Sequence, residues 1–219
     1  MVIPPSLPIV LLCIALLCVA TAKFAFAGKL LPADLDYAIF LKGERIGTYS
    51  FSIASEGRTR RVHATMHIVV KLLGVAVYQA SHERREVWNG DRLLSLEGRS
   101  DYNGKSYDLA LRRDGDSASL VVNGATQPLG PNFFTFVPWL IEGAKAAQLV
   151  TEKGRLLAVS AEDFGRSSLP GEDGRAVYRR HVYWGEQPRD AWYDDAGALV
   201  LMTYKQGNSE IRIRRASTK

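Results

Sequence analysis

Residues 46–53 read Ile-Gly-Thr-Tyr-Ser-Phe-Ser-Ile, and apolar and small polar side chains alternate along them. In an extended chain, successive side chains point to opposite faces. Tyr49, Phe51 and Ile53 therefore share one face, and the intervening Ser and Thr residues share the other. This period of two predicts a β-strand with one buried face.

The same period extends over most of the chain, and turn residues separate the segments. Asn103-Gly104 and Asn123-Gly124 are typical of tight hairpins, because both residue types tolerate positive φ. We expect strands at Leu35–Leu41, Ile46–Ile53, Arg61–Lys71, Val75–Trp88, Leu93–Arg99, Lys105–Arg113, Ala118–Val122, Arg155–Ala161, Arg175–Trp184, Asp190–Tyr193, Ala198–Gln206 and Glu210–Arg214. The pattern predicts a mainly β fold, in which a strongly curved antiparallel sheet forms a half-barrel or barrel of about 10 strands.

The alternation stops near residues 132–148. Aromatic and aliphatic side chains crowd residues 133–141, Asn132 is a favourable helix N-cap, and Ala144–Gln148 contains good helix formers. Pro138 confines a helix to part of this stretch. We therefore predict one short helical insertion here, packed as a lid over the sheet.

The N-terminal segment is typical of an export signal. Ile9–Ala22 is apolar, and the small residues of Ala25-Phe26-Ala27 follow it, so we expect residues 1–27 to be a cleaved signal peptide and the protein to be periplasmic or secreted. A second cut after Ala22 stays open. No Lys or Arg precedes the apolar run, which leaves an uncleaved anchor as the alternative.

Both cysteines, Cys13 and Cys18, lie inside that segment. A leucine precedes each of them, which argues against lipid attachment. Residues 28–219 are then expected to form a single all-β domain without disulfides or thiolate chemistry. The charge balance, 28 Lys+Arg against 23 Asp+Glu with a net charge of +5, does not indicate a nucleic-acid partner.

The sequence contains no nucleophile elbow, phosphate-binding glycine loop or zinc-protease helix. His67, His181 and Tyr183 are the acid–base candidates if the protein is an enzyme. On a strand, His63 and His67 lie about 13 Å apart, so one ion cannot bridge the two alone. A three-histidine site is conceivable if the chain folds back near Leu73-Gly74 and places His82 between them. We expect no metal and no cofactor. The alternating charges of residues 82–86 indicate a solvated strand face.

Some of the expected strands are apolar on both faces. Strict alternation places Leu199 and Leu201 on one face and Val200, Met202 and Tyr204 on the other. A second apolar face needs a helix, more sheet or a ligand to cover it. The candidates for lining a ligand cavity are large and apolar or aromatic: Tyr49, Phe51, Tyr78, Phe133, Phe136, Trp139, Trp192, Met202 and Tyr204.

Residues 72–77 read Leu-Leu-Gly-Val-Ala-Val, which is unusually apolar for a turn. One interpretation is a long bent strand with a bulge at Gly74. The other is an exposed tip that dips into a membrane or lines the mouth of a cavity.

Several short motifs are spread over most of the chain: Phe40 with Ile46-Gly47, Lys71-x-x-Gly74-x-x-x-Tyr78, Glu86-x-Trp88-Asn-Gly-x-Arg-Leu93, and Trp192-Tyr-Asp-x-x-Gly-x-Leu-Val200. With these motifs the chain resembles a family of uncharacterised exported bacterial proteins, a domain of unknown function. The resemblance implies an all-β exported domain and assigns no catalytic residue. A looser likeness, in architecture only, is to the Lol-type lipoprotein carriers, whose curved half-barrel and helical lid enclose lipid.

Three functions remain as hypotheses. The first is an exported protein that binds or carries an apolar ligand, lipid-like or aromatic, in a β cavity. The second is an envelope assembly or interaction module that contacts another envelope protein without a small ligand. The third is a small enzyme that uses cavity histidines and tyrosines. Contact with a membrane surface, without spanning it, is compatible with the first two.

Overall fold

The computed structural model describes residues 33–140, 147–171 and 176–216, which form 15 strands and, within these ranges, no helix. The strands are β1 (Asp34–Leu41), β2 (Glu44–Glu56), β3 (Thr59–Leu72), β4 (Val75–Asn89), β5 (Arg92–Tyr102), β6 (Lys105–Asp114), β7 (Ser117–Val122), β8 (Ala125–Pro128), β9 (Phe133–Phe134), β10 (Ala147–Val150), β11 (Leu156–Ser167), β12 (Tyr178–Trp184), β13 (Arg189–Tyr193), β14 (Leu199–Gln206) and β15 (Ser209–Arg215).

All strands belong to one sheet, in the order β8-β7-β6-β5-β4-β3-β2-β1-β15-β14-β13-β12-β11-β10-β9. Neighbouring strands of the sheet are consecutive in the chain, except at the centre, where β1 pairs with β15. β8 and β9 are consecutive in the chain but lie at opposite edges of the sheet. There Ile39 lies opposite Ile213. The β9–β10 pair is parallel and the other pairs are antiparallel. The sheet is therefore a long meander whose two halves are joined where the first and last strands meet.

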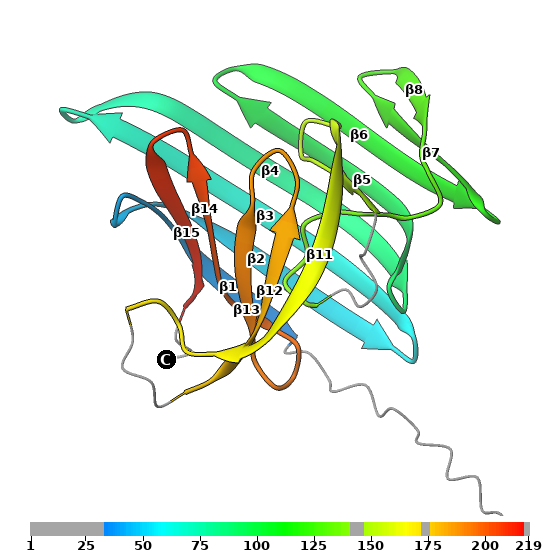
Figure 1. The fold of residues 1–219 in the computed structure, drawn as a ribbon. Helices are drawn as coiled ribbons and strands as arrows, with labels where there is room; N and C mark the ends of the chain where they lie inside the picture. The colour runs from blue at the N-terminus through cyan, green and yellow to red at the C-terminus, as the bar shows by residue number, and fades with distance from the viewer. Residues whose placement is uncertain (1–32, 141–146, 172–175, 217–219) are drawn as a thin grey trace, which may run out of the picture.

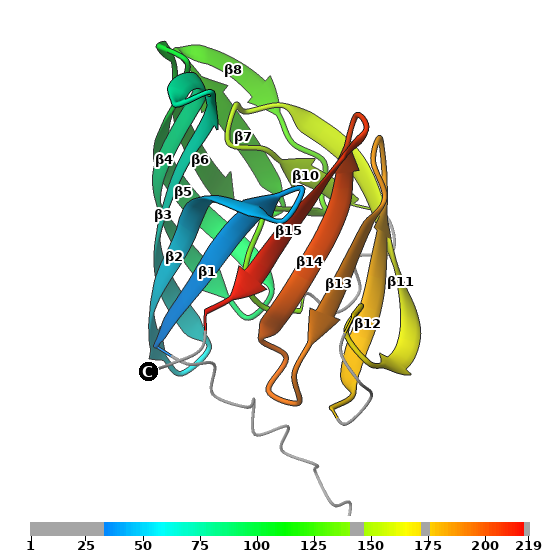
Figure 2. The same ribbon diagram turned by 90° about the vertical axis from the view of Figure 1, so that its left-hand side faces the viewer.

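The sheet curls, so that β1–β6 and β11–β15 face each other around a shared interior (Figures 1 and 2). The inner faces supply the main core, in which the side chains of Tyr37, Phe51, Trp88, Leu111 and Leu120 are almost completely buried. Alternation along each strand accounts for this burial, because every second residue faces the interior.

The expected half-barrel or barrel of about 10 antiparallel strands is wrong. The sheet is open and mixed, and it has 15 strands. The strands that we did not expect are β8, β9 and β10. Each has four residues or fewer, β8 ends in a proline, and β10 begins in a run of helix formers. Their pairing depends on neighbouring strands, which local sequence patterns do not report.

The helical insertion near residues 132–148 is also wrong. We call residues 133–140 the crossing segment. It contains no helix; it begins with β9 and passes beside the start of β14, where Trp139 forms a β-bridge with Ala198. Hydrogen bonds of 2.9 Å join Leu140 N to the Gly197 carbonyl and Leu199 N to the Pro138 carbonyl. These tertiary contacts outweigh local helix propensity. The expected helix formers at residues 144–146 lie outside the described residues.

The two apolar faces of β14 have a simpler cause than a ligand. A bulge between Trp192 and Tyr193 shifts the register, so that Leu199 joins Met202 in the inner core. Val200 and Leu201 instead pack with Trp192 and Leu169 in a small cluster outside the main core. The strict alternation that placed Leu199 and Leu201 on one face was therefore wrong. The loop that carries Leu169 covers the second apolar face.

Residues 1–27 lie outside the described residues, so the signal peptide stays a prediction. Within the described ranges, no helix has the length and apolar character needed to cross a bilayer.

Candidate functional site

A cavity of about 270 Å³ opens at one end of the interior. Its walls come from β1–β5, β10 and β13–β15, which are distant in sequence and meet because the sheet curls. Most of the lining side chains are apolar or aromatic: Ile39, Tyr49, Met66, Ile68, Tyr78, Tyr102, Phe136, Leu149, Val150, Met202, Tyr204 and Ile213. An adjoining cleft of about 230 Å³ shares Tyr102, Glu152, Lys153, Arg189 and Gln206 with this cavity.

The mouth of the cavity carries two cations, each beside an aromatic ring. The Arg189 guanidinium lies 5.2 Å from the ring centre of Tyr204, and Lys153 Nζ lies 4.1 Å from that of Tyr102. Arg189 Nε is buried, has no hydrogen-bond partner, and forms no ion pair with any described residue. A buried donor without a partner carries a desolvation cost that an anionic ligand would offset.

The loop of residues 151–154 places Lys153 at this mouth. Gly154 has φ +71°, and a Cβ at this position would lie 2.3 Å from Val122 Cγ2. A glycine is therefore required for the loop to pack this closely against β7. Gln127 Nε2 donates to the Gly154 carbonyl over 2.9 Å, and Ser100 Oγ donates to the Glu152 carbonyl over 2.6 Å. These contacts hold the loop over the interior.

Tyr49 forms the inner wall of the cavity. Its ring stacks on Phe51 at 4.5 Å and on Phe136 of the crossing segment at 5.4 Å. Burial raises the pKa of the Tyr49 hydroxyl. Burial likewise raises the pKa values of Tyr102 and Tyr204, so these tyrosines stay neutral at physiological pH.

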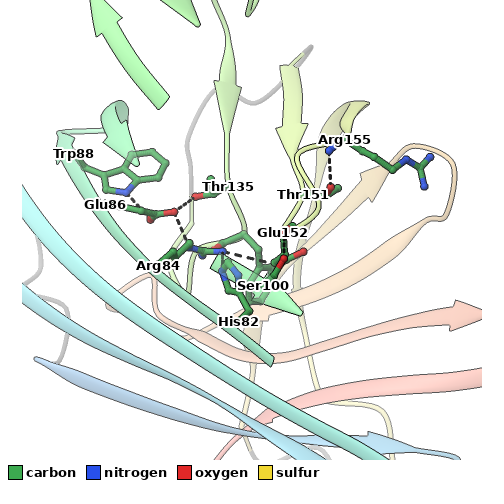
Figure 3. Close-up of polar contacts among 10 residues, drawn as sticks. His82, Arg84, Glu86, Trp88, Ser100, Thr135, Thr151, Glu152 and Arg155 are labelled. Atoms are coloured by element: carbon green, nitrogen blue, oxygen red, sulfur yellow. Dashed lines mark hydrogen bonds and ion pairs between the residues drawn. The ribbon is translucent and has the colours of Figure 1, made fainter. Parts of the chain in front are cut away.

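A buried polar network borders Tyr49, with the Arg84 guanidinium 5.8 Å from its ring centre. Figure 3 shows this network. Arg84 Nε lies 2.7 Å from Glu86 Oε1, and both side chains are buried. Glu86 also accepts hydrogen bonds from Trp88 Nε1 at 2.9 Å and from Thr135 Oγ1 at 2.6 Å. Arg84 donates to the carbonyl of Phe136. The network thus fastens the crossing segment to β4.

The ionisation of this network follows from its contacts. Burial works to lower the pKa of Arg84, but the charges of Glu86 and Glu152 more than offset it, so the pKa is raised. Burial and the neighbouring Arg84 lower the pKa of His82 to about 4. Arg84 is therefore a permanent, neutralised cation, and His82 is neutral at physiological pH. Because Arg84 already has these partners, it supplies little free charge to a ligand.

The expectation of a solvated face at residues 82–86 was wrong for three of these five residues. Glu83 and Arg85 are exposed, whereas His82, Arg84 and Glu86 face the interior and are buried. Sequence alternation places His82, Arg84 and Glu86 on one face. The aromatic or aliphatic residues on that face, such as Trp88, were the signal that it is an inner face.

The predicted cavity residues divide into two groups. Tyr49, Tyr78, Phe136, Met202 and Tyr204 line the cavity. The other four predicted residues line no part of it: Phe51, Phe133, Trp139 and Trp192. The first three of these are buried elsewhere in the main core, where Trp139 packs edge-on against Trp88 at 5.5 Å. Trp192 belongs to the separate cluster with Leu169, and its Nε1 donates to Ser167 Oγ at 3.0 Å.

The acid–base candidates do not lie together. His67 is exposed on β3. His181 is buried and packs edge-on against Tyr193, with ring centres 5.8 Å apart. Tyr183 is half-buried and shares a 2.9 Å hydrogen bond between hydroxyls with Tyr193. The structure therefore brings His181 and Tyr183 near one tyrosine but leaves His67 on the other side of the sheet.

The histidines that we considered for a metal site are also divided. His63 pairs with Glu83 at 3.0 Å on exposed side chains, and His82 is buried inside. Within the described ranges, no group of three or more His, Cys, Asp or Glu residues is arranged to hold a metal ion.

Sequence reasoning missed Arg189 and Lys153, the two cations at the mouth. Arg189 follows Pro188 in a polar stretch, and Lys153 precedes a glycine in a loop, so neither has a local pattern that marks it. Only the curling of the sheet brings them to one opening.

Comparisons with known proteins find one family and similar solved structures. The family model described as a domain of unknown function, DUF6134, matches residues 37–216. A solved structure of a β-barrel-like protein of the domain of unknown function DUF1849 from Brucella abortus is similar, with a TM-score of 0.61 and 10% identity, over 87% of this chain and 98% of that one. A DUF1089 family protein from Pseudomonas aeruginosa has a TM-score of 0.42 and 11% identity, over 69% of this chain and 87% of that one. No curated protein matches.

Proposed function

The chain belongs to the DUF6134 family, and we propose that it binds one small amphipathic molecule. The apolar part of this molecule would occupy the cavity, and an anionic group would lie at Arg189. The observation that carries the proposal is an apolar cavity whose mouth holds an arginine without an acidic partner among the described residues. We further propose that the protein acts after export, on the strength of the N-terminal sequence alone.

The cavity suits a single narrow apolar group. Its volume of about 270 Å³ lies just below the range of roughly 300–1,000 Å³ that small-molecule pockets occupy. Ile39, Met66, Ile68, Met202 and Ile213 offer aliphatic walls, and flexible methionines adapt to different chain shapes. One alkyl chain or small ring fits this description better than a multi-chain lipid.

The anionic group follows from the charges at the mouth. A guanidinium presents a planar fork of donors that matches a carboxylate or a phosphate. Glu152, the acidic residue that lines the cavity, has its carboxylate 3.9 Å from Arg84 Nη1, so Arg84 draws it away from a role as partner to Arg189. Lys153 adds a second positive charge on the same rim.

Calorimetric titration with dodecanoate and with dodecanol tests the proposal. These probes share one alkyl chain and differ in charge. We expect both to bind, and dodecanoate to bind about 10–100-fold more tightly, which corresponds to one charge-assisted hydrogen-bonded contact of about 1.5–3 kcal/mol. No binding of either probe would overturn the proposal.

Two matched pairs of variants locate the site. Ile68→Trp fills the cavity and should abolish binding of both probes, whereas Val69→Trp, one residue along and exposed, should leave binding unchanged. Arg189→Gln should remove the preference for dodecanoate, whereas Arg155→Gln should keep it, because exposed Arg155 is already paired with Glu186 at 3.2 Å. Equal effects within either pair would contradict the assignment.

A further inference from the structure

The hairpin between β3 and β4 ends in an exposed apolar tip. We define the tip as residues 72–77; the side chains of Leu72, Leu73, Val75 and Val77 are 64%, 96%, 67% and 54% exposed. Single exposed apolar residues need no explanation, but a contiguous group indicates an interaction surface. The sequence left a bulge or an exposed tip as alternatives here, and the structure shows a hairpin turn at Leu73-Gly74.

The backbone conformation of the turn is unfavourable for one residue of the tip. Leu73 has φ +51° and Gly74 has φ +82°. The other non-glycine residues with positive φ in the described ranges are Lys42, Asn103 and Asn123. Asparagine tolerates this conformation, but leucine does not favour it. Leu73 is strained and almost fully exposed, so it stabilises neither the turn nor the core.

The lysines gather at the same end of the molecule. Strand register puts the β1–β2, β3–β4, β5–β6 and β14–β15 turns together at the end where the cavity opens. Every lysine in the described part of the chain lies there: Lys42, Lys71, Lys105, Lys153 and Lys205. None of them forms an ion pair with a described residue.

The acidic residues at this end leave a positive excess. Glu210 is paired with Arg212, and Glu186 with Arg155. Asp101 accepts hydrogen bonds from the Gly104 amide and the Ser106 hydroxyl, and Glu152 lies near Arg84. Glu44 is next to Arg45 in the sequence, and the two side chains carry opposite charges.

The opposite end has a different composition. Its turns carry Asp91, Asp114, Asp116, Asp194 and Asp195 and no described lysine. Arg60, Arg92, Arg166 and Arg215 pair with four of these aspartates. The unpaired lysines of the described residues are therefore concentrated at the end where the cavity opens.

We propose that the tip and the lysines around it dock on an anionic lipid bilayer, with the cavity mouth facing the membrane. Aliphatic side chains gain by leaving water for the acyl region, and unpaired lysines are attracted to anionic headgroups. Ile68 and Tyr78 line the cavity and flank the tip on the same hairpin, so docking brings the mouth to the bilayer surface. The docking claim stands on the tip and the lysines, and it does not require the ligand proposed above.

Vesicle flotation of the full chain tests this proposal, with vesicles of phosphatidylcholine alone or mixed with phosphatidylglycerol. We expect binding to the mixed vesicles and about fivefold weaker binding for each lysine removed in Lys42→Gln and Lys71→Gln. All variants share the same N-terminal segment, so any contribution from residues 1–32 is constant. Absence of binding to mixed vesicles would overturn the proposal.

Leu73→Asn is the decisive variant, because asparagine suits the positive φ and the protein should fold at least as stably. We expect it to melt at the same or a higher temperature and to bind mixed vesicles about tenfold or more weakly. Phe164→Ser is the control, since it removes an exposed apolar side chain from β11, and it should bind as the wild type does. Unchanged binding by Leu73→Asn would show that the tip does not dock.

Discussion

The two ends of the interior are built from the same strands but packed in different ways. At one end, β4 contributes Trp88 and Glu86, and the crossing segment fills the space between β4 and β14. At the other end, the same strand contributes Tyr78 to a cavity of about 270 Å³. The crossing segment reaches only part of the interior. One curled sheet therefore holds both a solid core and a hollow.

The two ends also differ in how their charged side chains are paired. At the packed end, the charges of Arg84 and Glu86 are paired, and Glu86 has two further donors. At the hollow end, Arg189 has a buried Nε without a partner. Buried polar groups are normally satisfied, so this unpartnered atom beside the cavity is one of the observations on which the ligand proposal rests. The contrast lies in charge pairing alone, because Trp139 Nε1 and Arg60 Nη1 at the packed end are also buried without a hydrogen-bond partner.

Glu86→Gln should produce the largest effect. The variant leaves buried Arg84 with only the more distant carboxylate of Glu152, 3.9 Å away, and breaking a buried pair in this way costs about 3–5 kcal/mol. Urea unfolding measures the free energy of unfolding directly. The control is Glu210→Gln, which breaks an exposed pair with Arg212 and should cost less than about 1 kcal/mol. A loss below 1 kcal/mol for Glu86→Gln would mean that the network does not hold the packed end.

Truncation of aliphatic side chains should also distinguish the two ends. Leu93 is completely buried at the packed end, so Leu93→Ala should cost about 2–5 kcal/mol. Ile68 is half-buried and already borders the cavity, so Ile68→Ala should cost about 1 kcal/mol, because little new empty space is created. If Leu93→Ala and Ile68→Ala lowered the free energy of unfolding equally, the two ends would not differ in packing.

Acid should lower the free energy of unfolding through His82, and this should be the smallest of the three effects. Its pKa is about 4 in the folded protein, lowered by burial and by Arg84 from 6.5 in the unfolded chain. The unfolded state therefore binds more protons in this interval, and stability falls as the pH drops below about 6.5. The loss attributable to His82 should be on the order of 1 kcal/mol by about pH 5.5.

The difference between the wild type and His82→Gln isolates this contribution, because other groups titrate equally in both proteins. Unfolding should be measured at about pH 7.5 and about pH 5.5. A pH dependence identical in the two proteins would show that His82 is not held neutral by its surroundings.

Much of the strand pattern could be predicted from the sequence. The alternation at residues 46–53 corresponds to β2, and the Asn103-Gly104 and Asn123-Gly124 turns join β5 to β6 and β7 to β8. These features are local, since a period of two and a positive φ depend only on neighbouring residues. The crossing segment was mistaken for a helix because its backbone hydrogen bonds are made with Gly197 and Leu199, which are distant in the chain.

The candidate site was partly predictable for the same reason. Tyr49, Tyr78 and Met202 were selected as apolar or aromatic residues on strands, and such residues do line the cavity. The same criterion also selected Phe51, which packs in the core instead. Periodicity reports which face a residue is on, but it does not report how far along the interior the residue lies.

The sequence alone determined that the chain forms many strands with tight hairpins, and it marked the apolar run at residues 72–77, because these are properties of short stretches. The tertiary structure alone decided how far the sheet extends, which end of its interior is filled, and which charges are left without partners. Those outcomes depend on the pairing of β1 with β15 and on the path of the crossing segment. Both are contacts between residues far apart in the chain, and local patterns carry no record of them.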